Sequence, residues 1–317
     1  MHALRPLCAL LMLSAIPASR AQEADADAGC SSMVIFASDT QEPMRIEELL
    51  LPSDQNTLAT HALFTDMLAH SPTELFLLGD VVNLGYKAKR WAFIDTALAL
   101  ARVRRFHVHA ILGNHELMVR AAKGERNFQD RFPGHVRTGY TIRKDSIAVV
   151  LLNSNFSKLS KADMALQNDW YAHTLALLDT APDVRTIIVC CHHSPYSQSK
   201  LVGSSTAVQE HFVAPFRNAR KTSLFISGHA HLFQHFRMDD KHFFVIGGGG
   251  GLHHPLSTAP TAHVCLEPDY NPLFHYLTVE LCGSTLKVVS HRLKDDRSGF
   301  DEGCDYRIDV PALDQVP

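Results

Sequence analysis

The chain has 317 residues, of which 46% are hydrophobic and 20% charged, and its formal net charge is -3 with neutral histidine. These values are typical of a globular protein with a sizeable core, and they exclude the basic footprint of a general nucleic-acid binder. Twenty histidines are more than a core needs, which favours metal or proton chemistry.

The N-terminus has the pattern of an export signal. Arg5 precedes an apolar run at residues 7–16, and Ser19, Arg20 and Ala21 resemble a small-residue cleavage site. The run is shorter than the about 20 residues that a membrane-spanning helix needs, which disfavours the alternative of a retained anchor. We therefore expect a signal peptide at residues 1–21, and a single secreted or periplasmic domain at residues 22–317 without stable membrane insertion.

Strand and helix patterns alternate along most of the chain. Short apolar runs with β-branched or aromatic residues predict strands at residues 32–38, 74–78, 106–112, 147–153, 186–191 and 223–227. Helical patterns lie between them at residues 55–69, 87–101 and 161–179. The last third predicts further strands at residues 233–238, 243–246, 276–281 and 285–291. A mixed α/β sandwich of two facing sheets under helices fits this order better than one doubly wound sheet.

Two predicted helices carry more specific expectations. In the first, Leu58, Ala62, Met67 and Leu68 are predicted to share the buried face. In the last, the apolar positions at helical spacing are Leu166, Trp170 and Leu177. Its start, Ser160 followed three residues later by Asp163, predicts a capping box.

Export would leave six cysteines in an oxidising compartment, where disulfides are plausible. They are Cys30, Cys190, Cys191, Cys265, Cys282 and Cys304. Six cysteines allow 15 connectivities, and our expectation joins Cys265 to Cys282 and Cys30 to Cys304. The adjacent Cys190 and Cys191 should point to opposite faces of a strand and be free and buried. A cysteine nucleophile beside His192 is the alternative.

Metal-binding residue types follow the predicted strands. The motifs are Asp39-Thr40-Gln41, Gly79-Asp80, Gly113-Asn114-His115-Glu116, His192-His193 and Gly228-His229, with His231 two residues later. Strand ends of this kind are where open α/β sheets bind ligands. Carboxylate, amide and imidazole ligands suit manganese, iron or zinc, and one carboxylate can bridge two ions about 3.5–4 Å apart. The pattern predicts a two-metal hydrolytic centre.

The ordered motifs, with Ser194-Pro195 after the paired histidines, resemble the calcineurin-like metallophosphoesterase superfamily over roughly residues 33–250. The resemblance implies a four-layer sandwich of two mixed β-sheets flanked by helices. It also implies a cofactor of two divalent or trivalent metal ions.

The resemblance further implies a role for each motif residue. Asp39 and His231 would hold the first metal, Asp80 would bridge both, and the second would be held by Asn114, His192 and His229. His115 would be the catalytic acid that reaches the substrate phosphate. Glu116 would fix the loop or an imidazole by a hydrogen bond without binding metal.

The chain departs from the commonest family pattern at two positions. Gln41 stands where a histidine ligand is usual, and its amide oxygen is a weaker, harder donor that affects first-site affinity or metal preference. Asn83 stands where purple acid phosphatases have a metal-binding tyrosine, so that subclass is not assigned. One choice stays open: His192 is favoured over His193 as the ligand because a variable residue and a proline turn follow the family's ligand histidine.

These observations predict a secreted or periplasmic phosphoesterase that uses metal-activated hydroxide, with a monoester as the favoured substrate. The partner would be a small-molecule or phosphoprotein phosphate ester, and no nucleic acid beyond a nucleotide substrate is expected. The alternatives are a phosphodiesterase or nucleotidase of the same fold, or a non-catalytic binding protein whose decayed site is marked by Gln41. Residues 247–251, all glycine, are either a close approach to the site or a flexible turn.

Overall fold

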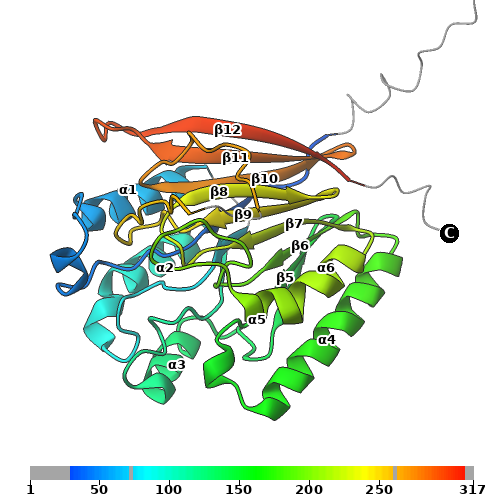
Figure 1. Cartoon of the computed structure of the whole chain (residues 1–317), viewed down its shortest axis with the longest axis horizontal. Coiled ribbons are helices and arrows are strands. Elements are labelled where there is room, and N and C mark those ends of the chain that lie inside the picture. Colours follow the sequence, from blue (N-terminus) through cyan, green and yellow to red (C-terminus); the bar gives the residue numbers. More distant parts are fainter. Residues whose placement is uncertain (1–28, 71–73, 260–262, 311–317) are drawn as a thin grey trace, which may run out of the picture.

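The computed structural model describes residues 29–70, 74–259 and 263–310, so the predicted signal peptide lies outside the described residues. Two six-stranded sheets form the centre of the fold (Figure 1). The first sheet has the order β12 (Phe300–Asp309), β11 (Thr285–Leu293), β10 (His275–Cys282), β1 (Val34–Ala37), β2 (Glu74–Leu77), β3 (His107–Ala110). The second has the order β4 (Tyr140–Lys144), β5 (Ile147–Leu151), β6 (Thr186–Cys190), β7 (Thr222–Ser227), β9 (Lys241–Ile246), β8 (Phe233–Met238).

Both sheets are mixed. Strands β1, β2 and β3 are parallel, as are β5, β6, β7 and β9, while the remaining neighbours pair antiparallel. Because parallel strands end at the same edge, each sheet brings the loops after its parallel strands together.

The α-helices are α1 (Asn56–Ala69), α2 (Ala92–Val103), α3 (Ala121–Gln129), α4 (Lys161–Thr180), α5 (Thr206–Val208) and α6 (Ala214–Asn218). Short 3₁₀ turns are η1 (Glu47–Leu49), η2 (Ala88–Trp91) and η3 (Phe156–Lys158), and η4 (Gln209–Val213) is a π-helical turn. Among the described residues, no helix has both the length and the apolar character that crossing a bilayer requires.

Three apolar layers hold the sheets and helices together. Phe36 and Phe76 of the first sheet face Ile188 of the second in the core between the sheets. On the outer face of the first sheet, a second core joins β1 to β3 with α1 and α2, and on the outer face of the second sheet a third joins β5 to β7 with α4. Figure 1 shows α4 and α6 running along that sheet. The arrangement confirms the predicted sandwich of two mixed sheets flanked by helices.

The buried faces of two helices differ from the prediction. Leu58 is 60% exposed, and α1 buries Ala59, Leu63 and Phe64 in addition to Met67. In α4 the buried residues are Gln167, Tyr171, Leu175 and Leu178, whereas Leu166 and Leu177 lie in solvent. Both helices carry apolar residues on more than one face, so docking against the sheet, not the spacing alone, selects the buried stripe. The capping box of Ser160 and Asp163 is confirmed.

The predicted elements recur with shifts of a few residues at their ends, and besides the short turns η1 and η3 four segments were not predicted. These are α3, β4, β12 and the helical segment of α5, η4 and α6. Strand β12 is an edge strand with several charged residues, so its sequence lacks the apolar run that marks a buried strand.

The expected disulfide pairing is wrong. Cys30 bonds to Cys282, while Cys265 and Cys304 are free. The segment before β1 pairs with the end of β10, which places Cys30 opposite Cys282. Cys190 and Cys191 are free and buried as predicted, with Cys190 in the core between the sheets and Cys191 beneath the helices.

Candidate metal centre

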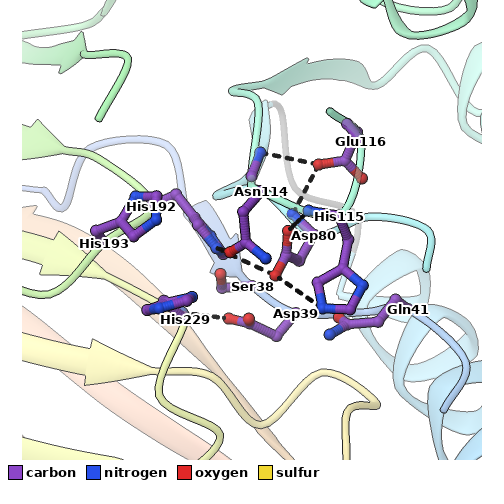
Figure 2. Close-up of polar contacts among 12 residues, drawn as sticks. Ser38, Asp39, Gln41, Asp80, Asn114, His115, Glu116, His192, His193 and His229 are labelled. Atoms are coloured by element: carbon purple, nitrogen blue, oxygen red, sulfur yellow. Dashed lines mark hydrogen bonds and ion pairs between the residues drawn. The ribbon is translucent and has the colours of Figure 1, made fainter. Parts of the chain in front are cut away.

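Every predicted site residue lies in a loop that follows a parallel strand, at the edge where both sheets end (Figure 2). Asp39 follows β1, Asp80 follows β2, and Asn114 with His115 follows β3. The second sheet supplies the histidines after β6 and β7. The structure therefore brings together side chains from five strands that are far apart in the sequence.

Three of these residues have an unusual backbone. Asp39, Asp80 and His229 have φ angles of 59°, 49° and 66°, in the left-handed region that non-glycine residues seldom occupy. Such conformations persist where the surroundings fix them, and they cluster at functional sites.

The second group of predicted ligands centres on Asp80. His192 Nε2 lies 3.1 Å from Asp80 Oδ2 and 3.1 Å from Asn114 Oδ1. At the other side of the ring, His192 Nδ1 donates to the backbone oxygen of Leu78 at 2.9 Å. A carbonyl oxygen can only accept, so this bond fixes the hydrogen on Nδ1 and leaves Nε2 facing the carboxylate, as in metal-binding histidines.

The first group centres on Asp39, which is fully buried. Its Oδ2 accepts a hydrogen bond from the His229 backbone at 2.8 Å. Its Oδ1 lies 3.4 Å from His231 Nε2 and accepts no hydrogen bond from any described residue. His231 Nδ1 donates to the backbone oxygen of Leu252 at 2.8 Å, which again leaves Nε2 facing inward. A buried carboxylate oxygen without a donor is the feature that a cation would satisfy.

Gln41 lies at the same point. When its amide is oriented to satisfy its neighbours, the nitrogen donates to the backbone oxygens of Asp39 and Asp80, at 3.1 and 2.8 Å. The amide oxygen then lies 3.2 Å from His231 Nε2. The oxygen and the imidazole therefore face one position, as two ligands of the same ion would.

The geometry favours His192 over His193 as the metal ligand. The ligand atoms of Asp39, Asp80 and His192 all lie within 4.8 Å of one another, and those of His192, His193 and His229 form a second such group. Only His192 belongs to both. His193 Nδ1 lies 2.8 Å from Ser154 Oγ, a contact that turns one ring nitrogen away from the carboxylates.

His115, the predicted acid, is held at three points. Its backbone nitrogen donates to Asp80 Oδ1 at 2.7 Å, and its Nδ1 donates to the backbone oxygen of Asn83 at 3.1 Å. Its Nε2 faces Asp80 Oδ2 at 3.9 Å and Glu47 Oε1 at 3.8 Å. Because Nδ1 is committed to a carbonyl, Nε2 is the atom that can carry a transferable proton.

Glu116 organises the loops beneath these residues. Its carboxylate accepts hydrogen bonds from the backbone nitrogens of Asp80, Val82 and Gly113, at 3.0, 3.0 and 2.8 Å. Burial and the charge of Asp80 raise the pKa of Glu116 to about 7. These contacts agree with the expected role of fixing the loops, and they link the end of β2 to the end of β3.

The pKa values of the candidate ligands are shifted because several charged groups are buried close together. Burial opposes the charged form of Asp80, but the charges of His192 and His115 outweigh it and hold its pKa well below the usual range. Burial likewise opposes the charged form of His192, yet Asp80 raises the pKa of His192 to about 9. Burial and the charge of His192 lower the pKa of His229 to about 4. The site thus compensates buried negative charge and holds His229 neutral, whereas His192 would lose its Nε2 proton on binding a metal.

Three contacts at the site were not predicted from the sequence. Glu47 approaches His115, Ser154 bonds His193, and His254 stacks on His231 with ring centroids 4.3 Å apart. Glu47 begins the 3₁₀ turn η1, His254 lies in an irregular segment, and Ser154 lies in the loop after β5. No periodicity or motif marks such positions, and their proximity to the site is a property of the tertiary fold.

The chain matches the family model described as calcineurin-like phosphoesterase over residues 33–233. A search of curated protein sequences finds no match.

Solved structures with a similar fold share little sequence with the chain. A purple acid phosphatase from yellow lupin (Lupinus luteus) seeds has a TM-score of 0.67 at 13% identity, over 90% of this chain and 54% of that one. The chain thus spans about half the length of the lupin protein. GAP50, described as the anchor in the inner membrane complex of Plasmodium, has a TM-score of 0.66 at 12% identity, over 90% of each chain. A dimetal phosphatase from Danio rerio has a TM-score of 0.51 at 15% identity, over 89% of this chain and 100% of that one.

Proposed function

The chain belongs to the calcineurin-like phosphoesterase family, whose members hydrolyse phosphate esters, and from this we propose that it is a two-metal phosphate monoesterase acting outside the cytoplasm. The observation that carries the proposal is the position of Asp80. Its carboxylate lies between His192 and His115, with Asp39 nearby and Asn114 facing the same imidazole. A carboxylate so placed can be shared by two ions.

The donor set fits the implied metals. The first ion would be held by Asp39, Gln41 and His231, with Asp80 as the shared ligand. The second would be held by Asp80, Asn114, His192 and His229. Mixed oxygen and nitrogen donors suit manganese, iron or zinc. The unpartnered oxygen of Asp39 supports a cation at the first position.

When bound, such a metal pair supplies a hydroxide nucleophile near neutral pH and Lewis acidity toward the phosphate oxygens. The protein's own contribution is position and proton transfer. His115 Nε2 faces the site beside Asp80 and would give its proton to the leaving alcohol oxygen. Glu116 accepts hydrogen bonds from the loop after β2 and from the loop after β3, and these bonds hold Asp80 and Asn114 in place for this step.

Further observations support a monoester substrate and a location outside the cytoplasm. Two proteins of similar fold are described as phosphatases, which favours a monoester by analogy of fold. Export rests on the signal-like pattern of residues 1–21. A disulfide between Cys30 and Cys282 suits an oxidising compartment.

A non-catalytic role is the second candidate. GAP50 has a similar fold and is described as an anchor, and Gln41 in this chain is a weaker donor than histidine. The two candidates differ in one measurable property, which is turnover with metal bound.

The test uses metal-stripped mature protein with manganese, iron or zinc restored, and assays an aryl phosphate against its diester. We expect turnover of the monoester that falls about 10²–10⁴-fold in His115→Ala. His173→Ala, an exposed histidine on α4, is the matched control and should retain full activity. Metal uptake without hydrolysis of either ester would contradict the proposal and favour the binding protein. Preference for the diester would contradict the monoester assignment alone.

A further inference from the structure

An apolar pocket of about 500 Å³ opens next to the candidate metal centre. Its hydrophobic walls come from two parts of the chain. Leu51 and Pro52 lie in the segment that joins β1 to α1, and Pro255, Leu273 and Phe274 lie in the segment that joins β9 to β10. Pockets of this size accommodate small organic ligands, and mainly apolar lining is typical of them.

The pocket and the metal centre share a wall. His253 lines the pocket, and the next residue, His254, stacks on the candidate ligand His231. Asn56 also lines the pocket and donates to the backbone oxygens of Gly250 and Gly251, at 2.8 and 2.9 Å. The backbone of Gly251 is so close to His231 that a Cβ there would lie 2.3 Å from its ring. A molecule in the pocket would therefore be separated from the candidate ligand His231 only by the residues of the shared wall.

Most polar groups of the pocket are already engaged, and the exception is His253 Nδ1, which is buried and has no hydrogen-bond partner among the described residues. Asp54 forms an ion pair with Arg297. Ser53 Oγ donates to Asn56 Oδ1 at 3.3 Å, and His253 Nε2 lies 3.1 Å from the amide of Asn271. The pocket lining thus offers no uncompensated charge for a second phosphate or an ammonium group, and its chemistry favours a hydrocarbon.

Exposed apolar side chains also lie in the segment of the chain between the predicted acid's neighbour Glu47 and the pocket. Ile46, Leu49 and Leu50 are 66%, 82% and 83% exposed. They flank Glu47, whose carboxylate lies 3.8 Å from His115 Nε2. Three large apolar residues exposed together beside a site mark a surface that binds an apolar group. Residues 46–52 therefore link Glu47, beside the predicted acid, to the pocket wall at Leu51 and Pro52, and three of the residues along the way are apolar and exposed.

From this continuity we propose that the pocket binds the alcohol portion of the substrate, and that this portion is a long apolar chain. The inference rests on the proposed function, because it assumes that the phosphate lies at the metal pair. With the phosphate there, the ester oxygen faces His115 and the chain extends over residues 46–52 into the pocket. Selectivity would then come from burial of the chain, worth about a two- to fourfold gain in kcat/KM per methylene.

The test measures phosphate release by the metal-loaded protein from ethyl, hexyl and decyl phosphate, each below its micelle concentration. We expect kcat/KM to rise steeply with chain length. Leu273→Asn, at the pocket wall, should flatten that dependence by at least tenfold on the decyl ester and leave the ethyl ester unchanged. Leu100→Asn on α2 is the matched control because Leu100 and Leu273 are similarly exposed, at 41% and 43%.

Each outcome bears on the inference separately from the proposed function. Hydrolysis with no dependence on chain length would overturn the pocket assignment and leave the phosphoesterase intact. If no ester is hydrolysed, calorimetric titration with decylphosphonate and methylphosphonate tests whether the pocket binds the apolar chain. Tighter binding of the decyl compound that is lost in Leu273→Asn would support the pocket, and equal binding would overturn it.

Discussion

Gln41 is one of the two residues at which the sequence departs from the commonest family pattern, and the structure shows how a glutamine fits there. Its amide nitrogen is engaged by the backbone oxygens of Asp39 and Asp80, so its oxygen is directed at the position that His231 also faces. An amide oxygen is a hard, neutral donor, while an imidazole is preferred by zinc and iron. Gln41 therefore favours a harder or more weakly held first ion without removing the site.

Replacing Gln41 by histidine tests this reading. Gln41→His should tighten zinc at the first site by about tenfold or more, because imidazole replaces a weaker ligand, with manganese affected less. The measurement is zinc and manganese titration of metal-stripped protein. Gln41→Ala should weaken the first ion and leave the second in place. Equal affinities in all three proteins would show that residue 41 does not contact the metal.

Glu116 offers a second test at this scale. Glu116→Gln keeps the shape but replaces one acceptor oxygen by an amide nitrogen, which cannot accept; either the bond from Val82 at Oε1 or the bonds from Asp80 and Gly113 at Oε2 are then lost. We expect a loss of about 1–3 kcal/mol in the free energy of unfolding, and a 10–100-fold loss in metal affinity. Urea denaturation and metal titration measure the two effects. Glu125→Gln, a partly buried glutamate on α3, is the control and should change metal affinity little.

The candidate ligands were predictable because each follows a strand whose apolar run is visible in the sequence. Their placement at one edge follows from parallel pairing of those strands. Glu47 and His254 were not predictable, since neither lies at a strand end: Glu47 begins the turn η1, and His254 lies in an irregular segment. Sequence spacing therefore identifies residues that a sheet positions, and it gives no access to those that a loop positions.

At the scale of elements, the glycine segment after β9 is a close approach and not merely a turn. Gly249 donates to the backbone of Ser38 at 2.9 Å, and Gly251 donates to that of Asp39 at 3.0 Å. The segment thus lies against the end of β1, and its hydrogen bonds fix the loop that carries Asp39. The sequence left this open, because five consecutive glycines are equally typical of a flexible turn.

Gly251→Ala tests the close approach. The added Cβ would overlap the His231 ring, so the ring must move and the first metal should bind at least tenfold more weakly. Metal titration measures the loss. Gly203→Ala is the matched control because its Cβ would meet nothing within 4 Å. Unchanged first-site affinity in Gly251→Ala would show that His231 is not a ligand or that the segment gives way freely.

The helices show a different limit of sequence reasoning. The existence of α1, α2 and α4 was predictable from the sequence, but the buried face of α4 was not, because Leu166 and Leu177 give an apolar stripe that the sheet leaves in solvent. The sheet instead packs against Tyr171 and Leu175, with Gln167 also buried. A helix with two apolar stripes is oriented by its partner, so the assignment needs the tertiary structure.

At the scale of the whole molecule, pairing between distant segments was the least predictable property. The bond from Cys30 to Cys282 spans 252 residues and joins the chain before β1 to the end of β10. It depends on which strand lies next to β1 in the sheet, which local sequence does not encode. The same tertiary packing buries several histidines away from the metal centre and lowers their pKa values, so they contribute to the response of the fold to acid.

His135 is the clearest of these buried histidines. It packs against Phe128 and Tyr140, and neither ring nitrogen has a partner in hydrogen-bonding geometry among the described residues. Burial lowers its pKa from 6.5 to about 4. The unfolded chain therefore binds a proton more readily than the folded one. The contribution of a neutral His135 to stability is complete above pH about 6.5 and is lost as pH falls toward about 4.

His135→Phe should remove this acid sensitivity because phenylalanine keeps the aromatic packing and cannot be protonated. We expect the variant to match or exceed the stability of the native protein at pH about 7.5, and to exceed it by a further ~2 kcal/mol at pH about 5. Urea denaturation of both proteins at the two pH values gives the difference, in which the shared titration of the metal-centre residues cancels. A difference that does not grow on acidification would show that His135 is protonated or hydrated in the folded state.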